Sequence, residues 1–326
     1  MSTASNPGDG TTVLPPKKSR TGLFIGLAVV VIAAIVAAVL IITNLNAPAA
    51  EPENGAITEG LGSASQPVRI GTVGASEPYW TTFKEAALEE GIAVDIIDFA
   101  SYPEPNPALA AGDLDLNQFQ HIVYLGEYEA ANDSGIVPIG STAIYPLGLY
   151  STKYDSVDEI QAGETVAIPD DPSNLARGLL ILQSAGLVTL EGGGSIFSTL
   201  DEVSADSKVK VTTLDAALTV TSLPDVAAAI INNDFVTDAG LTASDAIAQD
   251  DPSDPNALPY VNVFAVRAED RDDPTLLKLV KVYQETQAVL DGVQDVSGGT
   301  AELVKVPQDE LQASLDDVEA DTAAQK

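Results

Sequence analysis

The chain has 326 residues, enough for one large or two medium domains, with 45% hydrophobic residues and a formal net charge of −33. It has no cysteine, which excludes disulfides, thiolate zinc sites and thiol catalysis and leaves the redox compartment undetermined by cysteine usage. A strongly acidic surface repels phosphate backbones, so we do not expect nucleic acid as a partner.

The N-terminal part of the sequence predicts a membrane anchor. Residues 1–22 are polar and rich in Ser, Thr, Gly and Pro, so we expect a disordered cytoplasmic tail. Leu23–Ile42 is an uninterrupted apolar run of 20 residues, which matches the hydrocarbon thickness of a bilayer at 1.5 Å per helical residue. We therefore assign residues 23–43 to one N-terminal transmembrane helix.

The charges on either side of this run indicate the orientation of the chain. Lys17, Lys18 and Arg20 precede it, and no basic residue follows until Arg69. The positive-inside rule then predicts a single-pass protein of the cell membrane, with a cytoplasmic N-terminus and an extracytoplasmic C-terminal domain. A cleaved secretory signal is the alternative, because Ala47–Ala50 (APAA) is rich in small residues. The length of the apolar run favours the uncleaved anchor.

Beyond the apolar run the sequence predicts a flexible linker, residues 44–66, and a globular part that starts near Pro67. In that part strands and helices alternate, which favours α/β layers with largely parallel sheets, divided into two lobes. Pro224–Ile231 is typical of either a short helix or a strand. The expected strands are Val68–Val73, Ala93–Phe99, Ile136–Ile139, Ala143–Tyr150, Glu164–Ile168, Lys208–Thr213 and Val261–Val266, and the expected helices are Tyr79–Glu90, Asn106–Ala111, Asn174–Ser184 and Pro274–Leu290.

Few catalytic centres can be assembled from these residues. With His121 as the single histidine and no cysteine, a Cys/His dyad and a histidine-rich zinc site are excluded. There is no G-x-S-x-G elbow for a serine triad and no Gly-rich phosphate loop. Asp113-x-Asp115-x-Asn117 resembles the opening of a calcium loop, but the later positions lack the required Gly and Glu. A carboxylate pair stays open, since 48 acidic residues always allow one; we expect no cofactor and no metal.

The stretch Tyr102–Tyr124 predicts a small-molecule pocket. It holds His121 between Phe119 and Tyr124, in a chain that is only 5% aromatic. Ligand pockets are mostly apolar walls with a few placed polar groups, and aromatic rings around one imidazole fit this description. The alternative is a core aromatic cluster with one satisfied histidine.

A second candidate lies in Ile168–Gln183 (IPDDPSNLARGLLILQ). Asp170 or Ser173 can cap a helix that carries Arg177 one turn further on. Free amides at a helix N-terminus together with a guanidinium suit a carboxylate. A solvated arginine on a helix surface is the alternative.

Two asparagines complete the candidates. Asn232 ends the apolar run AAAII, which fits either a buried strand that delivers an amide into a cleft or a simple turn. Asn262 interrupts a strand of β-branched and aromatic residues, so its amide must find partners in a neighbouring loop or in a ligand.

Five motifs, GDLDLNQFQHIVYL, YPLGLYS, VAIPDDPSNLARGLLILQ, DVAAAIINNDF and PYVNVFAVR, occur in this order. They resemble the methionine-binding proteins of ABC importers, the NlpA-type lipoprotein family, over about Val68–Val306. The resemblance implies an α/β, two-lobed, periplasmic-binding-protein-like (type II) fold with two crossover strands and a cleft between the lobes. Lobe 1 would comprise residues 67–144 plus 260–326, and lobe 2 residues 145–259.

The resemblance also implies seven ligand-binding residues: four that form the family's thioether pocket, one arginine that pairs with the ligand carboxylate, and two asparagines that bond the polar end of the amino acid. In this order they are Tyr102, Phe119, His121, Tyr124, Arg177, Asn232 and Asn262.

As a member of that family, the chain would be a monomeric extracytoplasmic solute-binding protein. It would capture L-methionine or a related amino acid and deliver it to an ABC importer permease with its ATPase. The family's lipobox cysteine is absent, so the predicted transmembrane helix replaces it. Ala75–Trp80 (ASEPYW) departs from the family's usual turn and leaves open methionine, its D-isomer or another amino acid. A membrane-anchored amino-acid sensor is the alternative; an enzyme on the same fold is less favoured.

Overall fold

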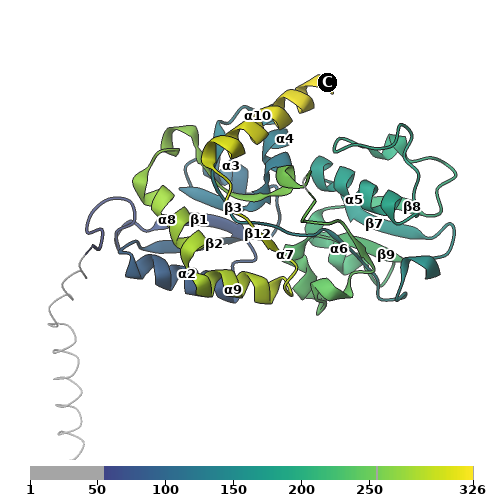
Figure 1. The fold of residues 1–326 in the computed structure, drawn as a ribbon, viewed down its shortest axis with the longest axis horizontal. Coiled ribbons are helices and arrows are strands. Elements are labelled where there is room, and N and C mark those ends of the chain that lie inside the picture. Colours follow the sequence, from purple (N-terminus) through teal and green to yellow (C-terminus); the bar gives the residue numbers. More distant parts are fainter. Residues whose placement is uncertain (1–54, 255, 326) are drawn as a thin grey trace, which may run out of the picture. The chain divides into compact units, whose positions relative to one another are not determined.

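Two five-stranded sheets, joined by two connections, make up the structure, a computed structural model that describes residues 55–254 and 256–325 (Figure 1). The predicted tail (1–22), the predicted transmembrane helix (23–43) and residues 44–54 of the predicted linker lie outside the described residues. Across the described ranges, no helix is both long and apolar enough to span a bilayer.

The first sheet has the strand order β2-β1-β3-β11-β4. Strand β1 runs parallel to β2 and β3, whereas β11 is antiparallel to both β3 and β4. Strand β11, which comes from a distant part of the chain, therefore lies between β3 and β4. The strands are β1 (Val68–Val73), β2 (Val94–Phe99), β3 (Leu116–His121), β4 (Ile136–Ser141) and β11 (Asn262–Arg267).

Helices cover both faces of the first sheet, and strand β11 shows why both faces are apolar. Phe264 and Val266 belong to one hydrophobic core, whereas Val263 and Ala265 belong to the other. Alternate residues of a strand point to opposite faces, so a strand buried on both faces is apolar throughout. The first core also receives α2 (Pro78–Glu89), α8 (Pro274–Glu285) and α9 (Gln287–Val296), and the second receives α3 (Pro105–Ala110), α4 (Ile122–Asn132) and α10 (Gln308–Ala324).

The second sheet has the order β10-β6-β9-β7-β8. Strand β7 is parallel to β8 and β9, and β6 is antiparallel to β9 and β10. The ambiguous segment Pro224–Ile231 contributes the fully buried central strand β9. The elements are β6 (Gly148–Tyr150), β7 (Thr165–Pro169), β8 (Lys210–Leu214), β9 (Ala228–Ile231) and β10 (Ala248–Gln249), with helices α5 (Pro172–Ser184), α6 (Ala216–Ser222) and α7 (Asn233–Val236).

The chain passes between the sheets twice, through residues 142–147 and through residues 250–261. The first connection contains β5 (Ala143–Ile144), which pairs with β12 (Glu302–Leu303) near the end of the chain. The second contains a 3-10 turn, Leu258–Tyr260, instead of a strand. Ala143–Tyr150, expected to be one strand, is thus divided into β5 and β6.

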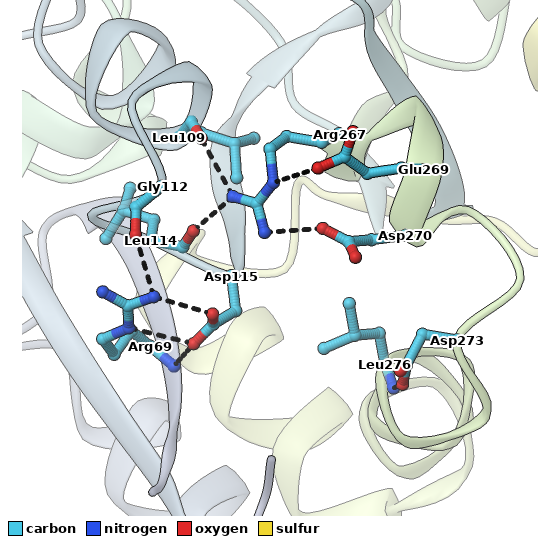
Figure 2. Close-up of polar contacts among 10 residues, drawn as sticks. All are labelled: Arg69, Leu109, Gly112, Leu114, Asp115, Arg267, Glu269, Asp270, Asp273 and Leu276. Atoms are coloured by element: carbon cyan, nitrogen blue, oxygen red, sulfur yellow. Dashed lines mark hydrogen bonds and ion pairs between the residues drawn. The ribbon is translucent and has the colours of Figure 1, made fainter. Parts of the chain in front are cut away.

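Two arginines fix the turn that leads into β3, as Figure 2 shows. Arg267 Nη1 donates to the backbone oxygens of Leu109 at 3.0 Å and Leu114 at 2.7 Å. Arg69 Nη2 donates to Asp115 Oδ1 at 2.8 Å. Because β3 begins directly after Asp115, these bonds set the position of the strand that carries two of the predicted site residues.

The expected helix Pro274–Leu290 is two helices, so that prediction is wrong. Thr286, with φ −82° and ψ 103°, leaves the helical region and separates α8 from α9. The change of direction lets the apolar faces of both helices pack against the same core, which includes Tyr283 and Val293.

The end of the predicted linker also packs on the fold. Ile57 and Leu61 lie against the first core, and Ile57 N donates to the backbone oxygen of Gly91 at 2.9 Å. Two apolar side chains in an otherwise polar stretch are enough to attach it, so the packed part begins before Pro67.

Candidate functional site

A cavity with about 370 Å³ of space not occupied by protein atoms is lined by residues from elements of both sheets. All seven residues predicted to bind a ligand line this cavity. The complete lining is Tyr102, Phe119, Gln120, His121, Tyr124, Tyr145, Pro146, Leu147, Asn174, Arg177, Asn232, Asn233 and Asn262.

Strand ends deliver several of these side chains. His121 is the last residue of β3, and Asn262, the first residue of the antiparallel β11, is its register partner. Asn232 follows β9 directly. Ligands of open α/β sheets bind outside the carboxyl ends of parallel strands, and β3 and β9 both end at this cavity.

Three aromatic rings form one wall. The ring centroids of Tyr102 and Phe119 are 5.9 Å apart, those of Tyr102 and Tyr124 are 6.0 Å apart, and those of Phe119 and Tyr124 are 5.7 Å apart. Phe235 of α7 extends the cluster from the second sheet, 5.3 Å from the ring of Tyr102. Such a wall is apolar and polarizable, which suits an aliphatic or thioether side chain.

His121 is a neutral hydrogen-bond donor. Its Nδ1 accepts from the backbone N–H of Tyr124 at 3.1 Å, so the proton of the neutral ring lies on Nε2. Nε2 in turn donates to Asn174 Oδ1 at 3.3 Å. Burial, and secondarily the positive charge of Arg177, lowers the pKa of His121 to about 3.

Arg177 is buried in the cavity wall, which rules out the solvated surface arginine considered above. Its side chain is 7% exposed, and Nε pairs with Asp250 Oδ2 at 2.6 Å. Nη2 donates to the backbone oxygen of Tyr145 at 2.8 Å, and the guanidinium lies 4.3 Å from the ring centre of Tyr260. In the described part of the chain no hydrogen bond from Nη1 is found, so the N–H donors of this nitrogen are not used within the protein.

The cap of α5 differs from the prediction. Asp171, rather than Asp170 or Ser173, is the N-cap residue, and its Oδ1 accepts from the backbone N–H of Asn174 at 3.0 Å. The hydroxyl of Ser173 also donates to this oxygen, at 2.9 Å. In the sequence Asp-Asp-Pro the second Asp is adjacent to the proline at the first helical position, and this spacing selects it.

Asn232 presents an unpaired acceptor. Its Nδ2 donates to Asn174 Oδ1 at 3.0 Å. Its Oδ1 is buried and has no hydrogen-bond partner among the described residues. A buried acceptor without a partner is costly, so a donor from a ligand fits this position.

Six lining residues were not predicted, although some carried a signal. Tyr145, Pro146 and Leu147 form the start of the YPLGLYS motif, which served only for the resemblance. Gln120 belongs to a buried amide network in β3, and Asn233 adjoins Asn232. Asn174 is the first residue of the expected helix Asn174–Ser184, and an asparagine at the start of a helix is the signal that points to it.

Two α/β sheets joined by two connections, with a cavity lined from both, define a binding protein of the periplasmic type. The model of the NlpA lipoprotein family matches residues 68–302, and the chain belongs to this family.

Named relatives agree with this assignment. The D-methionine-binding lipoprotein MetQ of Yersinia pestis is 37% identical over 240 residues, 72% of this chain and 87% of that protein. Protein PG110 from Staphylococcus aureus superposes with a TM-score of 0.73 at 34% identity, covering 77% of this chain and 99% of that one. A nutrient-binding protein from Burkholderia cenocepacia, solved bound to methionine, gives a TM-score of 0.67 at 37% identity, covering 72% of this chain and 99% of that one.

Proposed function

We propose that this chain is an extracytoplasmic solute-binding protein that binds L-methionine or a closely related amino acid and delivers it to an ABC permease with its ATPase. The names of its relatives support this ligand class. The observation that carries the proposal is that the buried guanidinium of Arg177 and an aromatic wall line one cavity. A free amino acid needs a fixed cation for its carboxylate and an apolar sleeve for its side chain.

The proposed binding mode assigns one role to each part of the cavity. The ligand carboxylate accepts from Arg177 Nη1, and its ammonium donates to Asn232 Oδ1. The thioether lies among Tyr102, Phe119, His121 and Tyr124, where polarizable contacts replace hydrogen bonds. Asn262 bonds the polar end of the ligand.

Binding rather than turnover is the proposed activity. The relatives are named as binding proteins, and His121 with a pKa of about 3 is a poor base at neutral pH.

Calorimetry on the full-length protein tests the proposed binding mode. Arg177→Ala removes the partner of a desolvated carboxylate and should cost roughly 2–5 kcal/mol of binding, about 30-fold to several thousand-fold in affinity for L-methionine. Arg177→Lys should recover only part of this, because a single ammonium cannot hold Asp250, the Tyr145 carbonyl and the ligand carboxylate in the geometry of a planar guanidinium. Near-wild-type affinity in Arg177→Ala would place the carboxylate elsewhere.

The arrangement along the chain is proposed as well: a cytoplasmic tail (1–22), a single transmembrane helix (23–43), a linker, and two lobes, 67–144 plus 260–326 and 145–259. The strands of each five-stranded sheet fall within one of these lobes, which supports the division. Full-length protein should stay in the membrane fraction after a carbonate wash, and the extracytoplasmic part should sediment as a monomer. Mature protein starting near Glu51 and free in the medium would show a cleaved signal.

A further inference from the structure

Asn174, at the start of α5, uses every polar atom of its side chain within the protein. It is 1% exposed, and its Nδ2 donates to Asp171 Oδ1 at 2.9 Å. Its Oδ1 accepts from Asn232 Nδ2 at 3.0 Å and from His121 Nε2 at 3.3 Å. The amide therefore links the helix cap to two residues that line the cavity.

The direction of these bonds follows from Asp171. A carboxylate oxygen only accepts, so Asn174 must turn its Nδ2 toward Asp171 and its Oδ1 toward the cavity residues. Since that oxygen accepts, Asn232 must offer its Nδ2 to it. The oxygen of Asn232 is then left over, buried and without a partner among the described residues.

His121 favours the same orientation of the Asn174 side-chain amide. The backbone N–H of Tyr124 occupies its Nδ1, which fixes the ring proton on Nε2 and makes the ring a donor to Asn174. A flipped Asn174 would set its Nδ2 against this proton and against the Nδ2 of Asn232. Two donor clashes oppose the flip, so the orientation is determined from both sides.

We propose that Asn174, held by Asp171, is a positioning residue that makes the site selective for ligands with a hydrogen-bond donor on the α-carbon. This inference rests on the proposed function and names the class of ligand within it: an α-amino acid in preference to the corresponding α-keto acid or the acid without an amino group. A keto oxygen would face the side-chain oxygen of Asn232, and no hydrogen bond can form because both atoms are acceptors. An acid without the amino group would leave that oxygen unpaired, and sites built around a hydrogen bond reject such analogues strongly.

This selectivity can be measured on the full-length protein by comparing three ligands: L-methionine, 4-(methylthio)butanoate and 4-methylthio-2-oxobutanoate. All three share the carboxylate and the thioether and differ only at the α-carbon. Wild-type protein should bind L-methionine at least about 100-fold more tightly than either analogue, as measured by calorimetry. A wild-type preference below about tenfold would overturn the inference without any variant.

Asn174→Leu keeps a similar volume and frees the Asn232 amide to rotate. We expect the preference for L-methionine over the keto acid to fall by about tenfold or more. Phe119→Ala is the matched control: it should weaken all three ligands while the ratios stay at the wild-type values. Should Asn174→Leu not fold, Asn174→Ser in the same space carries the same expectation.

Unchanged ratios in a folded Asn174 variant would overturn the positioning role, because a merely structural residue would alter affinity without altering the ratio. Failure of the proposed function has a different signature: wild-type protein would then bind none of the three ligands, whatever stands at position 174.

Discussion

Asp234, on α7 of the second sheet, is a carboxylate placed where its charge is disfavoured. The hydroxyl of Tyr102, which lies beyond β2 of the first sheet, donates to its Oδ2 at 2.8 Å, and Asn233 Nδ2 donates to its Oδ1 at 2.8 Å. No salt bridge to Asp234 occurs in residues 55–254 and 256–325. Burial raises its pKa to about 7; these hydrogen bonds oppose the rise, and the charge of Glu77 adds to it.

The raised pKa makes stability fall as pH rises. Below pH 3.8 the carboxyl is protonated in both the folded and the unfolded chain, so it has no differential effect. Between this pH and about 7 the unfolded chain loses the proton while the folded chain keeps it, and each pH unit costs about 1.4 kcal/mol. Above about pH 7 the cost is complete, up to about 4 kcal/mol for a shift from 3.8 to about 7.

Asp234→Asn removes this cost and keeps an oxygen for the Tyr102 hydroxyl. Urea unfolding of the two proteins from pH 4 to pH 8 should show the variant gaining stability relative to wild type as pH rises, by up to about 4 kcal/mol at pH 8. Asp158→Asn, at an exposed position, removes the same formal charge and serves as the control. A difference between Asp234→Asn and wild type that is constant with pH would refute the reasoning.

Two further predictions concern the polar end of the cavity. Asp250→Ala leaves the buried charge of Arg177 without its carboxylate and should destabilise the fold by about 3 kcal/mol in urea unfolding. Asp251→Ala, at the exposed neighbouring position, should change the free energy of unfolding by less than about 0.5 kcal/mol. Equal effects of the two variants would show that the ion pair does not stabilise the fold. His121 is the only histidine, so its ring resonance in a proton NMR spectrum is unambiguous, and it should not titrate between pH 5 and pH 8 because its pKa is about 3; a midpoint near 6.5 would show that the ring is accessible to solvent.

Strands with a clear apolar pattern could be predicted from the sequence, and β1 matches its expected range, Val68–Val73. Strand β3 could not, because LNQFQH mixes amides with apolar residues. Its amides are satisfied by each other and by a distant partner: Asn117 Nδ2 and Gln120 Nε2 both donate to Asn106 Oδ1, at 2.9 and 2.7 Å. Hydrophobic periodicity does not reveal a strand whose buried polar side chains find their hydrogen-bond partners only in the folded structure.

Helix α4 could not be predicted from the sequence, for a related reason. Its N-cap is His121, which accepts through Nδ1, so the usual Ser, Thr, Asp or Asn signal is absent. The same residue thus ends a strand, caps a helix and lines the cavity, and only the last of these roles was expected.

The residues of the candidate site could be predicted from the sequence better than the hydrogen bonds between them. The residues named from motifs, among them Arg177 and Asn232, all line one cavity, although the spacing alone left surface and turn alternatives open. The role of Asn174 could not be read from the sequence, because it depends on a contact with a residue 58 positions away.

The pairing of β12 with β5 makes the C-terminal part of the chain a brace for the first connection between the sheets. Ser141 Oγ donates to the backbone oxygen of Val304 at 2.7 Å, and Val304 N donates to the oxygen of Thr142 at 3.2 Å. The brace ends at Ile144, so residues 145–147 are the part of this connection that lies between the brace and β6. Those three residues also line the cavity, so the unbraced segment is itself a wall of the site, and a change of angle between the sheets there would reshape the space around a bound molecule directly.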